Sequence, residues 1–171
     1  AVLTQRAADA VAGRGGLTLV SGEAGAGKTV FVEAFTSGRA TPVLWGACDP
    51  LSTPRPLGPI RDLADRLGAD AQRLLVSAEQ PHDIYSAVFA RLASEPVVLV
   101  VDDLHWADQG TIDLLRFVLR RVRGTSSLVV GTFRDDEIDA AHPLRSLLGD
   151  VARSPDAAGP PPPRPWPARA A

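Results

Sequence analysis

The sequence predicts a single α/β domain in which helices cover both faces of a parallel β-sheet. Short apolar runs alternate along the chain with segments whose apolar residues recur three and four positions apart. Such alternation of strands and helices is typical of parallel sheets. The chain has 171 residues, 45% of them hydrophobic, which suits one globular domain. We place this domain at residues 1–153.

Four apolar runs are the expected strands. They are Leu17–Val20, Pro42–Ala47, Pro96–Val101 and Ser127–Phe133. The third run consists mainly of valine and leucine without polar interruption, a pattern that indicates a strand buried on both faces.

Helical spacing predicts the segments between and around these strands. The expected helices are Gln5–Ala12, Lys28–Phe35, Ile60–Leu67, Ala71–Ala78, Ile84–Leu92, Gln109–Val122 and Pro143–Val151, with Asp108 as the N-cap of the sixth. Pro50, Pro54, Pro56 and Pro59 predict a surface loop without regular structure. Residues 154–171 are rich in proline, arginine and alanine, so we expect a tail that is disordered or extended.

Composition excludes several classes of function. A net charge of -2 gives no overall attraction to nucleic acids or anionic membranes. No apolar run approaches the roughly 20 residues that span a bilayer. Cys48 is the only cysteine, which rules out an internal disulfide and indicates a reduced compartment; we expect a small packed thiol rather than a reactive one. We therefore expect a cytoplasmic protein with no membrane partner.

A glycine-rich segment after the first strand is the strongest functional signal. Gly22–Thr29 reads GEAGAGKT, which matches the pattern G-x-x-x-x-G-K-[ST] between a strand and a helix. In such loops backbone N–H groups surround phosphate oxygens at the positive end of a helix dipole. The candidate nucleotide-binding residues are Gly22, Glu23, Ala24, Gly25, Ala26, Gly27, Lys28, Thr29 and Val30. Lys28, the only lysine of the chain, would reach the β- and γ-phosphates; a chance glycine-rich turn is the alternative.

Two aspartates follow the third strand. Strand tips near a phosphate loop are where a carboxylate organises magnesium, so Asp102 and the Thr29 hydroxyl are the candidate metal ligands. Asp103 is the candidate catalytic acid that polarises the attacking water. An acidic turn without chemistry is the alternative. His105 and Trp106 are expected to pack rather than to catalyse.

Arg134 lies directly after the fourth strand. A fixed guanidinium there could sense the γ-phosphate, which makes Arg134 a third candidate catalytic residue beside Lys28 and Asp103. The alternative is a surface ion pair with Asp135 or Glu137; we favour the sensor.

Together, SGEAGAGKT, LWGACDPLSTPRPLGPIRDLA, VVLVVDDLHWADQGTIDLLRFVLRRV and VVGTFRDDE resemble the ATPase domain of the large LuxR-family, MalT-like transcriptional regulators. These domains form part of the signal-transducing STAND branch of the AAA-like ATPases. The resemblance implies a P-loop NTPase fold, ATP and Mg²⁺ as ligands, and slow hydrolysis in a switch that self-associates. It also implies DNA binding only through a C-terminal domain, of which this chain shows no sign. The family's last core strand and lid are not recognisable either, so the chain resembles a fragment.

Two other functions remain open at this point. A P-loop kinase-type phosphoryl transferase would share the fold but needs an acceptor pocket and its own lid. A nucleotide-binding remnant would keep the loop and lack turnover. No guanine-reading N-K-x-D string occurs, which favours ATP and ADP over guanine nucleotides.

Overall fold

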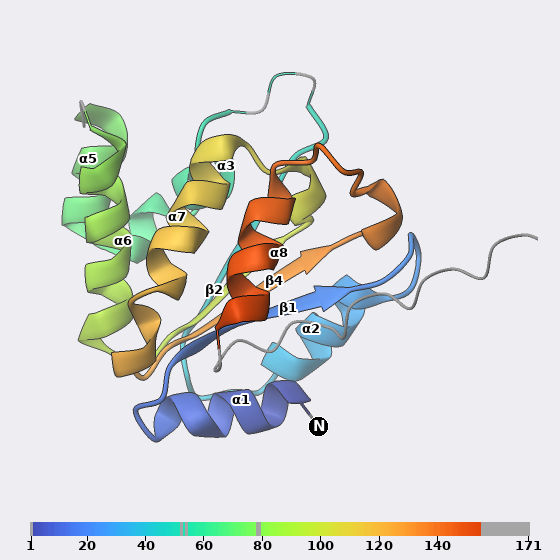
Figure 1. Cartoon of the computed structure of the whole chain (residues 1–171). Coiled ribbons are helices and arrows are strands. Elements are labelled where there is room, and N and C mark those ends of the chain that lie inside the picture. The colour runs from blue at the N-terminus through green and yellow to red at the C-terminus, as the bar shows by residue number, and fades with distance from the viewer. Residues whose placement is uncertain (1, 52, 54, 78–79, 155–171) are drawn as a thin grey trace, which may run out of the picture.

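The structure is a computed structural model and describes residues 2–51, 53, 55–77 and 80–154. A four-stranded sheet lies between two layers of helices (Figure 1). The strands are β1 (Gly16–Ser21), β2 (Val43–Ala47), β3 (Val98–Asp102) and β4 (Leu128–Phe133), and all neighbouring pairs are parallel. Their spatial order is β1-β4-β3-β2, so β1 and β2 form the edges of the described sheet. The predicted α/β class with a parallel sheet is confirmed.

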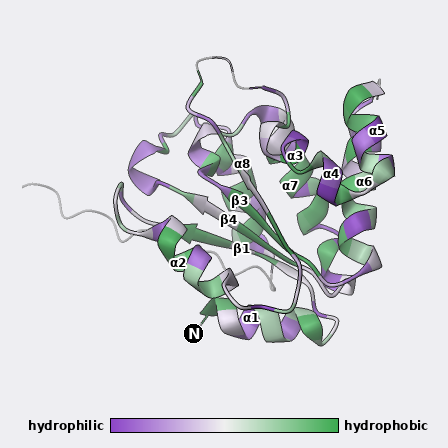
Figure 2. Cartoon of the chain, turned by 180° about the vertical axis from the view of Figure 1, so that it is seen from behind, coloured by the Kyte–Doolittle hydropathy of each residue, from purple (hydrophilic) through white to green (hydrophobic). Residues whose placement is uncertain are grey.

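Alternate residues of the strands face the two helical layers. On β3, Leu99 and Val101 belong to one core cluster, whereas Val98 and Val100 belong to the other. The second cluster is covered by α1 (Val2–Val11) and α2 (Lys28–Thr36). The first contains residues of α3 (Gly58–Arg61), α4 (Ala64–Leu67), α5 (Ala69–Ser77), α6 (Pro81–Ser94), α7 (Gln109–Leu119) and α8 (Leu144–Arg153). Figure 2 shows the apolar strands enclosed by helices whose colours alternate between apolar and polar.

Asp108 caps α7 as predicted, because its side chain accepts a hydrogen bond from the backbone N–H of Thr111. The helix nevertheless ends at Leu119, three residues before the predicted end at Val122. Val122 starts a short 3₁₀ turn instead, and its carbonyl accepts the hydroxyl and the backbone N–H of Thr125. Val122 is buried although it lies outside the helix, so the apolar pattern alone predicts a helix end that is too late.

The prediction that the proline-bearing segment lacks regular structure is wrong at Pro59. This residue lies in the first turn of α3, where a proline loses no helical hydrogen bond, and it is buried. α3 packs closely on β2: a Cβ added at Gly46 would lie 2.4 Å from the carbonyl oxygen of Pro59. The backbone N–H of Leu57, just before α3, donates to Asp108 at 3.1 Å. The last part of the segment is therefore fixed against the sheet.

The predicted helix Ile60–Leu67 is split into α3 and α4. Leu63 donates its backbone N–H to the carbonyl of Ile60, three residues back, and this tighter turn interrupts the helix. Ile60, Leu63 and Leu67 are all buried, so the apolar spacing is retained across the break.

Two further expectations concern the termini and the membrane. Apart from Ser154, the predicted tail 154–171 lies outside the described residues, as does Ala78 at the end of the predicted helix Ala71–Ala78. Within the described residues, no helix has the length and apolarity to cross a membrane.

Cys48 is buried, and burial raises the pKa of its thiol to about 12, so it is packed rather than reactive.

Candidate functional site

The glycine-rich segment forms an exposed loop between the end of β1 and the start of α2. Gly25 and Gly27 have φ angles of 74° and 76°, in the left-handed region that glycine adopts without strain. Glu23, Ala24 and Ala26 are exposed on the same loop. The sequence is therefore suited to a loop whose backbone, and not its side chains, faces a ligand.

Lys28 begins α2 and folds back over this loop. Its Nζ donates to the carbonyl oxygens of Gly22 at 2.7 Å and Glu23 at 2.8 Å. Both partners are neutral backbone groups, so the ammonium charge is hydrogen-bonded here without being neutralised by them. The ammonium therefore lies against the loop and can attract an anion that binds there.

Asp102 joins the loop helix to the sheet. Its Oδ2 accepts from the hydroxyl of Thr29 at 3.0 Å, and its Oδ1 accepts from the hydroxyl of Thr132 on β4. The carboxylate is buried, with 5% of the residue exposed. We call Thr29, Asp102 and Thr132 the anchored side of the site. Two segments far apart in the sequence thus meet at the carboxyl end of the sheet.

β4 lies between β1 and β3, so the strand that carries Asp102 is not a direct neighbour of the strand that precedes the loop. Thr29 on α2 connects the loop to Asp102 through its hydroxyl. Thr132 on β4 contacts both Asp102 and Asp103 and was not among the residues predicted from the sequence. A buried threonine in an otherwise apolar strand was the available signal, because a buried hydroxyl requires a partner.

Asp103 has a different environment although it is the next residue. Its backbone has a φ of 56°, unusual for a residue other than glycine, and its N–H donates to the Thr132 hydroxyl at 3.0 Å. Its carboxylate is about one quarter exposed and lies 3.9 Å from Nδ1 of His105. This strained backbone lies directly after β3, and such strain occurs often at functional sites.

Arg134 follows β4 and pairs with Glu137, with 2.6 Å between Nη1 and Oε1. Its guanidinium also lies 5.1 Å from the centre of the Trp106 ring. The hydrogen bond with Glu137 raises the pKa of Arg134, and the same bond lowers the pKa of Glu137. The ion pair weighed as the alternative for Arg134 is thus present, while the sensor role stays a prediction.

His105 lies between the carboxylates of Asp103 and Glu137. Its side chain is fully buried, and neither ring nitrogen has a hydrogen-bond partner. Burial lowers the pKa of His105; the charges of Asp103 and Glu137 act in the opposite direction. The ring packs on Trp106 with 4.4 Å between centroids. We call Asp103, His105, Arg134 and Glu137 the open side of the site.

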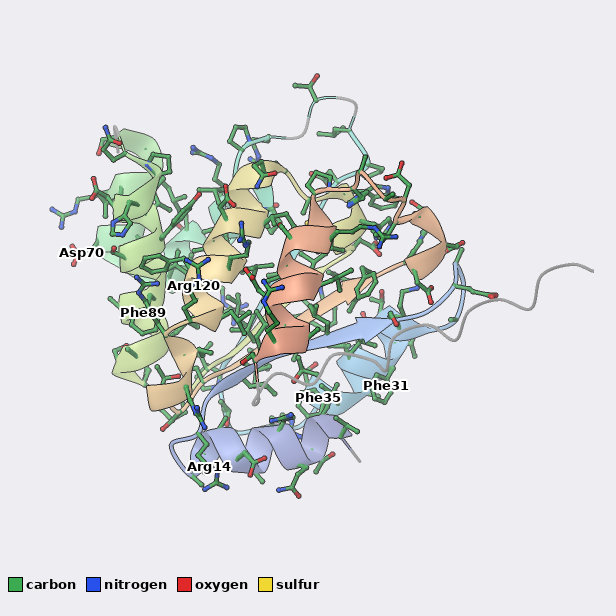
Figure 3. All side chains as sticks on the ribbon, in the orientation of Figure 1. Arg14, Phe31, Phe35, Asp70, Phe89 and Arg120 are labelled. Carbon is green, nitrogen blue, oxygen red and sulfur yellow. The ribbon has the colours of Figure 1, made fainter. Side chains whose placement is uncertain are left out.

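Two other surface features are exposed apolar side chains on α2 and a groove. Val30, one of the candidate nucleotide-binding residues, and Phe31 lie on the first turns of α2 and are 67% and 50% exposed; Figure 3 shows Phe31 pointing outward from that helix. A groove of about 850 Å³ lies between α5 and α6. None of the predicted site residues lines the groove, so it is a separate feature.

The chemistry of the site fits a nucleotide with a magnesium ion. The donors are backbone N–H groups and one lysine, which suit phosphate oxygens. The Thr29 hydroxyl and the Asp102 carboxylate present oxygen atoms, the kind of ligand that Mg²⁺ prefers. These two oxygens are already within hydrogen-bonding distance of each other, so the donor set is assembled in the chain itself.

Comparison with solved structures agrees with this fold. The chain is similar to chains in "Structure of Drosophila ORC bound to DNA", with 16% identity, a TM-score of 0.56, and coverage of 91% of this chain and 84% of the other. For Drosophila ORC bound to AT-rich DNA and Cdc6 the values are 16%, 0.56, 91% and 51%. For Drosophila ORC bound to GC-rich DNA and Cdc6 they are 16%, 0.54, 91% and 52%. At this identity the likeness shows the fold alone.

Sequence families identify the chain more directly. No curated protein matches it. The family model described as AAA ATPase domain matches residues 1–130, which include the glycine-rich loop and the aspartate pair. Members of this family bind nucleotide, typically with Mg²⁺. The chain therefore belongs to the AAA ATPase domain family.

Proposed function

We propose that this chain is an ATP-binding and slowly hydrolysing switch module of a signal-transducing transcriptional regulator of the large LuxR, MalT-like class. The observation that carries the ATPase part is the contact between the Thr29 hydroxyl and Asp102, 3.0 Å apart, which unites the loop and the aspartate pair in one site. The four motifs quoted above support the regulator class.

Lys28 and the loop backbone bind phosphate in this proposal. Nζ exchanges the carbonyls of Gly22 and Glu23 for phosphate oxygens, and these two carbonyls hold the ammonium in place beforehand. A phosphate oxygen carries negative charge and a backbone carbonyl does not, so the ammonium is attracted more strongly to phosphate, which favours the exchange. Lys28 is thus a cation that is already held beside the loop.

Thr29 and Asp102 hold the magnesium ion. A bound Mg²⁺ would supply Lewis-acid neutralisation of phosphate charge. Thr132 keeps the Asp102 carboxylate oriented by donating to its second oxygen. The metal ligand is therefore fixed from two sides, by α2 and by β4.

Asp103 and Arg134 act on the open side. Asp103 orients and polarises water, and its partial exposure supports this role because water must reach it. Arg134 leaves Glu137 to engage the γ-phosphate. An arginine at this position has a defined alternative partner in Glu137, which suits a residue that changes partner.

Self-association is the proposed response of the switch. β1 is an edge strand of the described sheet, and an edge strand presents unpaired backbone groups to another chain. Drosophila ORC, bound to DNA and Cdc6 in the similar structures, supports assembly as a property of such folds. DNA contact would be made by another domain, since the chain carries a net charge of -2.

ATP binding and turnover of the purified chain with Mg²⁺ test the proposal, beside Lys28→Ala and Asp103→Asn. We expect weak binding by Lys28→Ala, and full binding with lost hydrolysis by Asp103→Asn. Arg14→Ala, a change at an exposed position between α1 and β1, is the matched control and should behave like the unaltered chain. Binding without hydrolysis by the unaltered chain would make it a nucleotide-binding remnant, and absence of binding would refute the proposal.

A further inference from the structure

His105 is a buried side chain whose two polar atoms both lack a hydrogen-bond partner. Among the described residues the other such buried atoms are single ones, Oγ1 of Thr18 and Nη1 of Arg91. Unsatisfied buried polar groups cost stability, so each one in a folded protein calls for a physical reason. Packing, the role expected of His105 from the sequence, does not account for a polar ring there.

Two carboxylates face the ring from opposite ends. Oδ1 of Asp103 is 3.9 Å from Nδ1, and Oε2 of Glu137 is 3.6 Å from Nε2. Both distances are slightly longer than a hydrogen bond, so a small displacement closes either contact. The other oxygen of Glu137 already accepts from Arg134. A continuous row of groups therefore runs from Arg134 through Glu137 and His105 to Asp103.

The surroundings hold the ring in place. The carbonyl oxygen of His105 accepts a hydrogen bond from Nε2 of His142 at 3.0 Å, and Nδ1 of His142 accepts from the backbone N–H of Leu144. Trp106 covers the ring on one side. The hydrogen bonds fix the backbone of His105, and rotation of its buried ring would break the contact with Trp106. The expected response of the ring to a change nearby is therefore a small tilt or a change of tautomer.

A neutral imidazole carries one N–H, and the other nitrogen is an acceptor. Burial favours this neutral form, as do the positive charges of Arg134 and Lys28, against the opposite influence of Asp103 and Glu137. A neutral ring can donate a hydrogen bond to only one of the two carboxylates. The donor is either Nδ1, toward Asp103, or Nε2, toward Glu137.

We propose that His105 is a positioning residue that couples the Arg134–Glu137 ion pair to Asp103 by giving its single N–H to one carboxylate or the other. While Arg134 neutralises Glu137, the N–H is on Nδ1 and is directed at Asp103. When Arg134 leaves, Glu137 takes the N–H of Nε2, and Asp103 loses its hydrogen-bond donor. In this exchange Nδ1 gives its proton to water and Nε2 takes one from water, so the imidazole stays neutral.

This inference rests on the role proposed above for Asp103, but its first test requires no turnover. The ¹⁵N chemical shifts of a histidine show which ring nitrogen carries the proton. We expect His105 to carry it on Nδ1 in the unaltered chain and on Nε2 in Arg134→Ala. Arg14→Ala is the control and should match the unaltered chain. The His105 signal is assigned by its loss in His105→Phe. The same tautomer in the unaltered chain and in Arg134→Ala would overturn the proposal.

The second test is a double-mutant cycle on ATP turnover with His105→Phe and Glu137→Gln. Coupled residues show interaction terms of roughly 2- to 150-fold. We expect Glu137→Gln to change kcat several-fold in the unaltered chain and to have no effect once His105 is phenylalanine; His105→Gln is the substitute if the phenylalanine variant melts early. Effects that simply multiply would overturn the coupling. A chain that hydrolyses no ATP would refute the proposed function, and the tautomer measurement would still decide this inference.

Discussion

The anchored side and the open side of the site begin at adjacent residues, yet their chemistry differs. Both oxygens of Asp102 accept hydrogen bonds from threonine hydroxyls, and the residue is buried. The Asp103 carboxylate lies 3.9 Å from Nδ1 of His105, and part of its side chain is exposed. Asp102 is the last residue of β3, whereas Asp103 has a left-handed backbone. A fixed carboxylate suits metal binding, whereas a loosely held one suits a group whose hydrogen bonding must change.

The largest expected effect comes from Asp102→Asn on the anchored side. An amide removes the negative charge that would neutralise Mg²⁺, so we expect Mg²⁺-dependent ATP affinity to fall by about 100-fold or more. Asp113→Asn, on the exposed face of α7, is the matched control. Affinities measured with and without Mg²⁺ check the prediction. Unchanged Mg²⁺ dependence in Asp102→Asn would place the metal elsewhere and break the comparison between the two sides.

Thr132→Val tests the residue that both sides share. The change removes the donor to Asp102 and the acceptor for the backbone N–H of Asp103 at nearly constant volume. Leaving buried polar groups unpaired costs about 1–3 kcal/mol, so the free energy of unfolding should fall by that amount.

Thr18→Val is the control for this substitution. Thr18 is also a buried threonine in a strand, but its hydroxyl has no partner. Its replacement by valine should leave the chain equally stable or more stable. Urea unfolding of both variants compares them, and equal losses would mean that the Thr132 hydrogen bonds contribute nothing.

Asp108→Ala tests a third carboxylate of the string DDLHWAD that belongs to neither side. It caps α7 and accepts from the backbone N–H of Leu57. We expect a loss of about 1 kcal/mol in stability, the usual value for an N-cap, with ATP affinity retained. Gln109→Ala, at an exposed position next to it, is the control. A loss of ATP binding in a folded Asp108→Ala chain would bring Asp108 into the site.

The smallest expected effect is the pH dependence from the open side. The pKa of His105 is lowered in the folded chain, so the unfolded chain binds more protons between the folded pKa and the ordinary value of about 6.5. The contribution of His105 to stability is therefore full above that ordinary value and is lost as the pH falls toward the folded pKa. Melting temperatures across this range should show the slope, and His105→Phe should reduce it. His82→Phe, an exposed position, should not.

The sequence predicted the strands and the meeting of the loop with the aspartate pair better than it predicted the details around them. Apolar runs identify buried strands directly, as for β3. They do not reveal where a helix is interrupted, because Ile60, Leu63 and Leu67 are buried on both sides of the break between α3 and α4. Apolar spacing records which side chains are buried, and not which backbone hydrogen bond forms.

Contacts between residues that are far apart in the chain also could not be predicted from the sequence. Thr132 and His105 acquire their importance from partners on other segments, and a single threonine or histidine in a strand or turn is usually a packing residue. The ion pair of Arg134 could be considered from the sequence because Glu137 is only three residues away. Local pairs can be anticipated from spacing; the bridge from β4 to both aspartates required the strand order.

Titration calorimetry of the unaltered chain with ATP, in Mg²⁺ and in EDTA, shows whether Lys28, Thr29 and Asp102 form a nucleotide and magnesium site. We expect binding that is markedly tighter with Mg²⁺, is lost in Lys28→Ala, and loses its Mg²⁺ dependence in Asp102→Asn. Binding of equal strength in all three chains, or none in the unaltered chain, would contradict a nucleotide and magnesium site built on Lys28, Thr29 and Asp102.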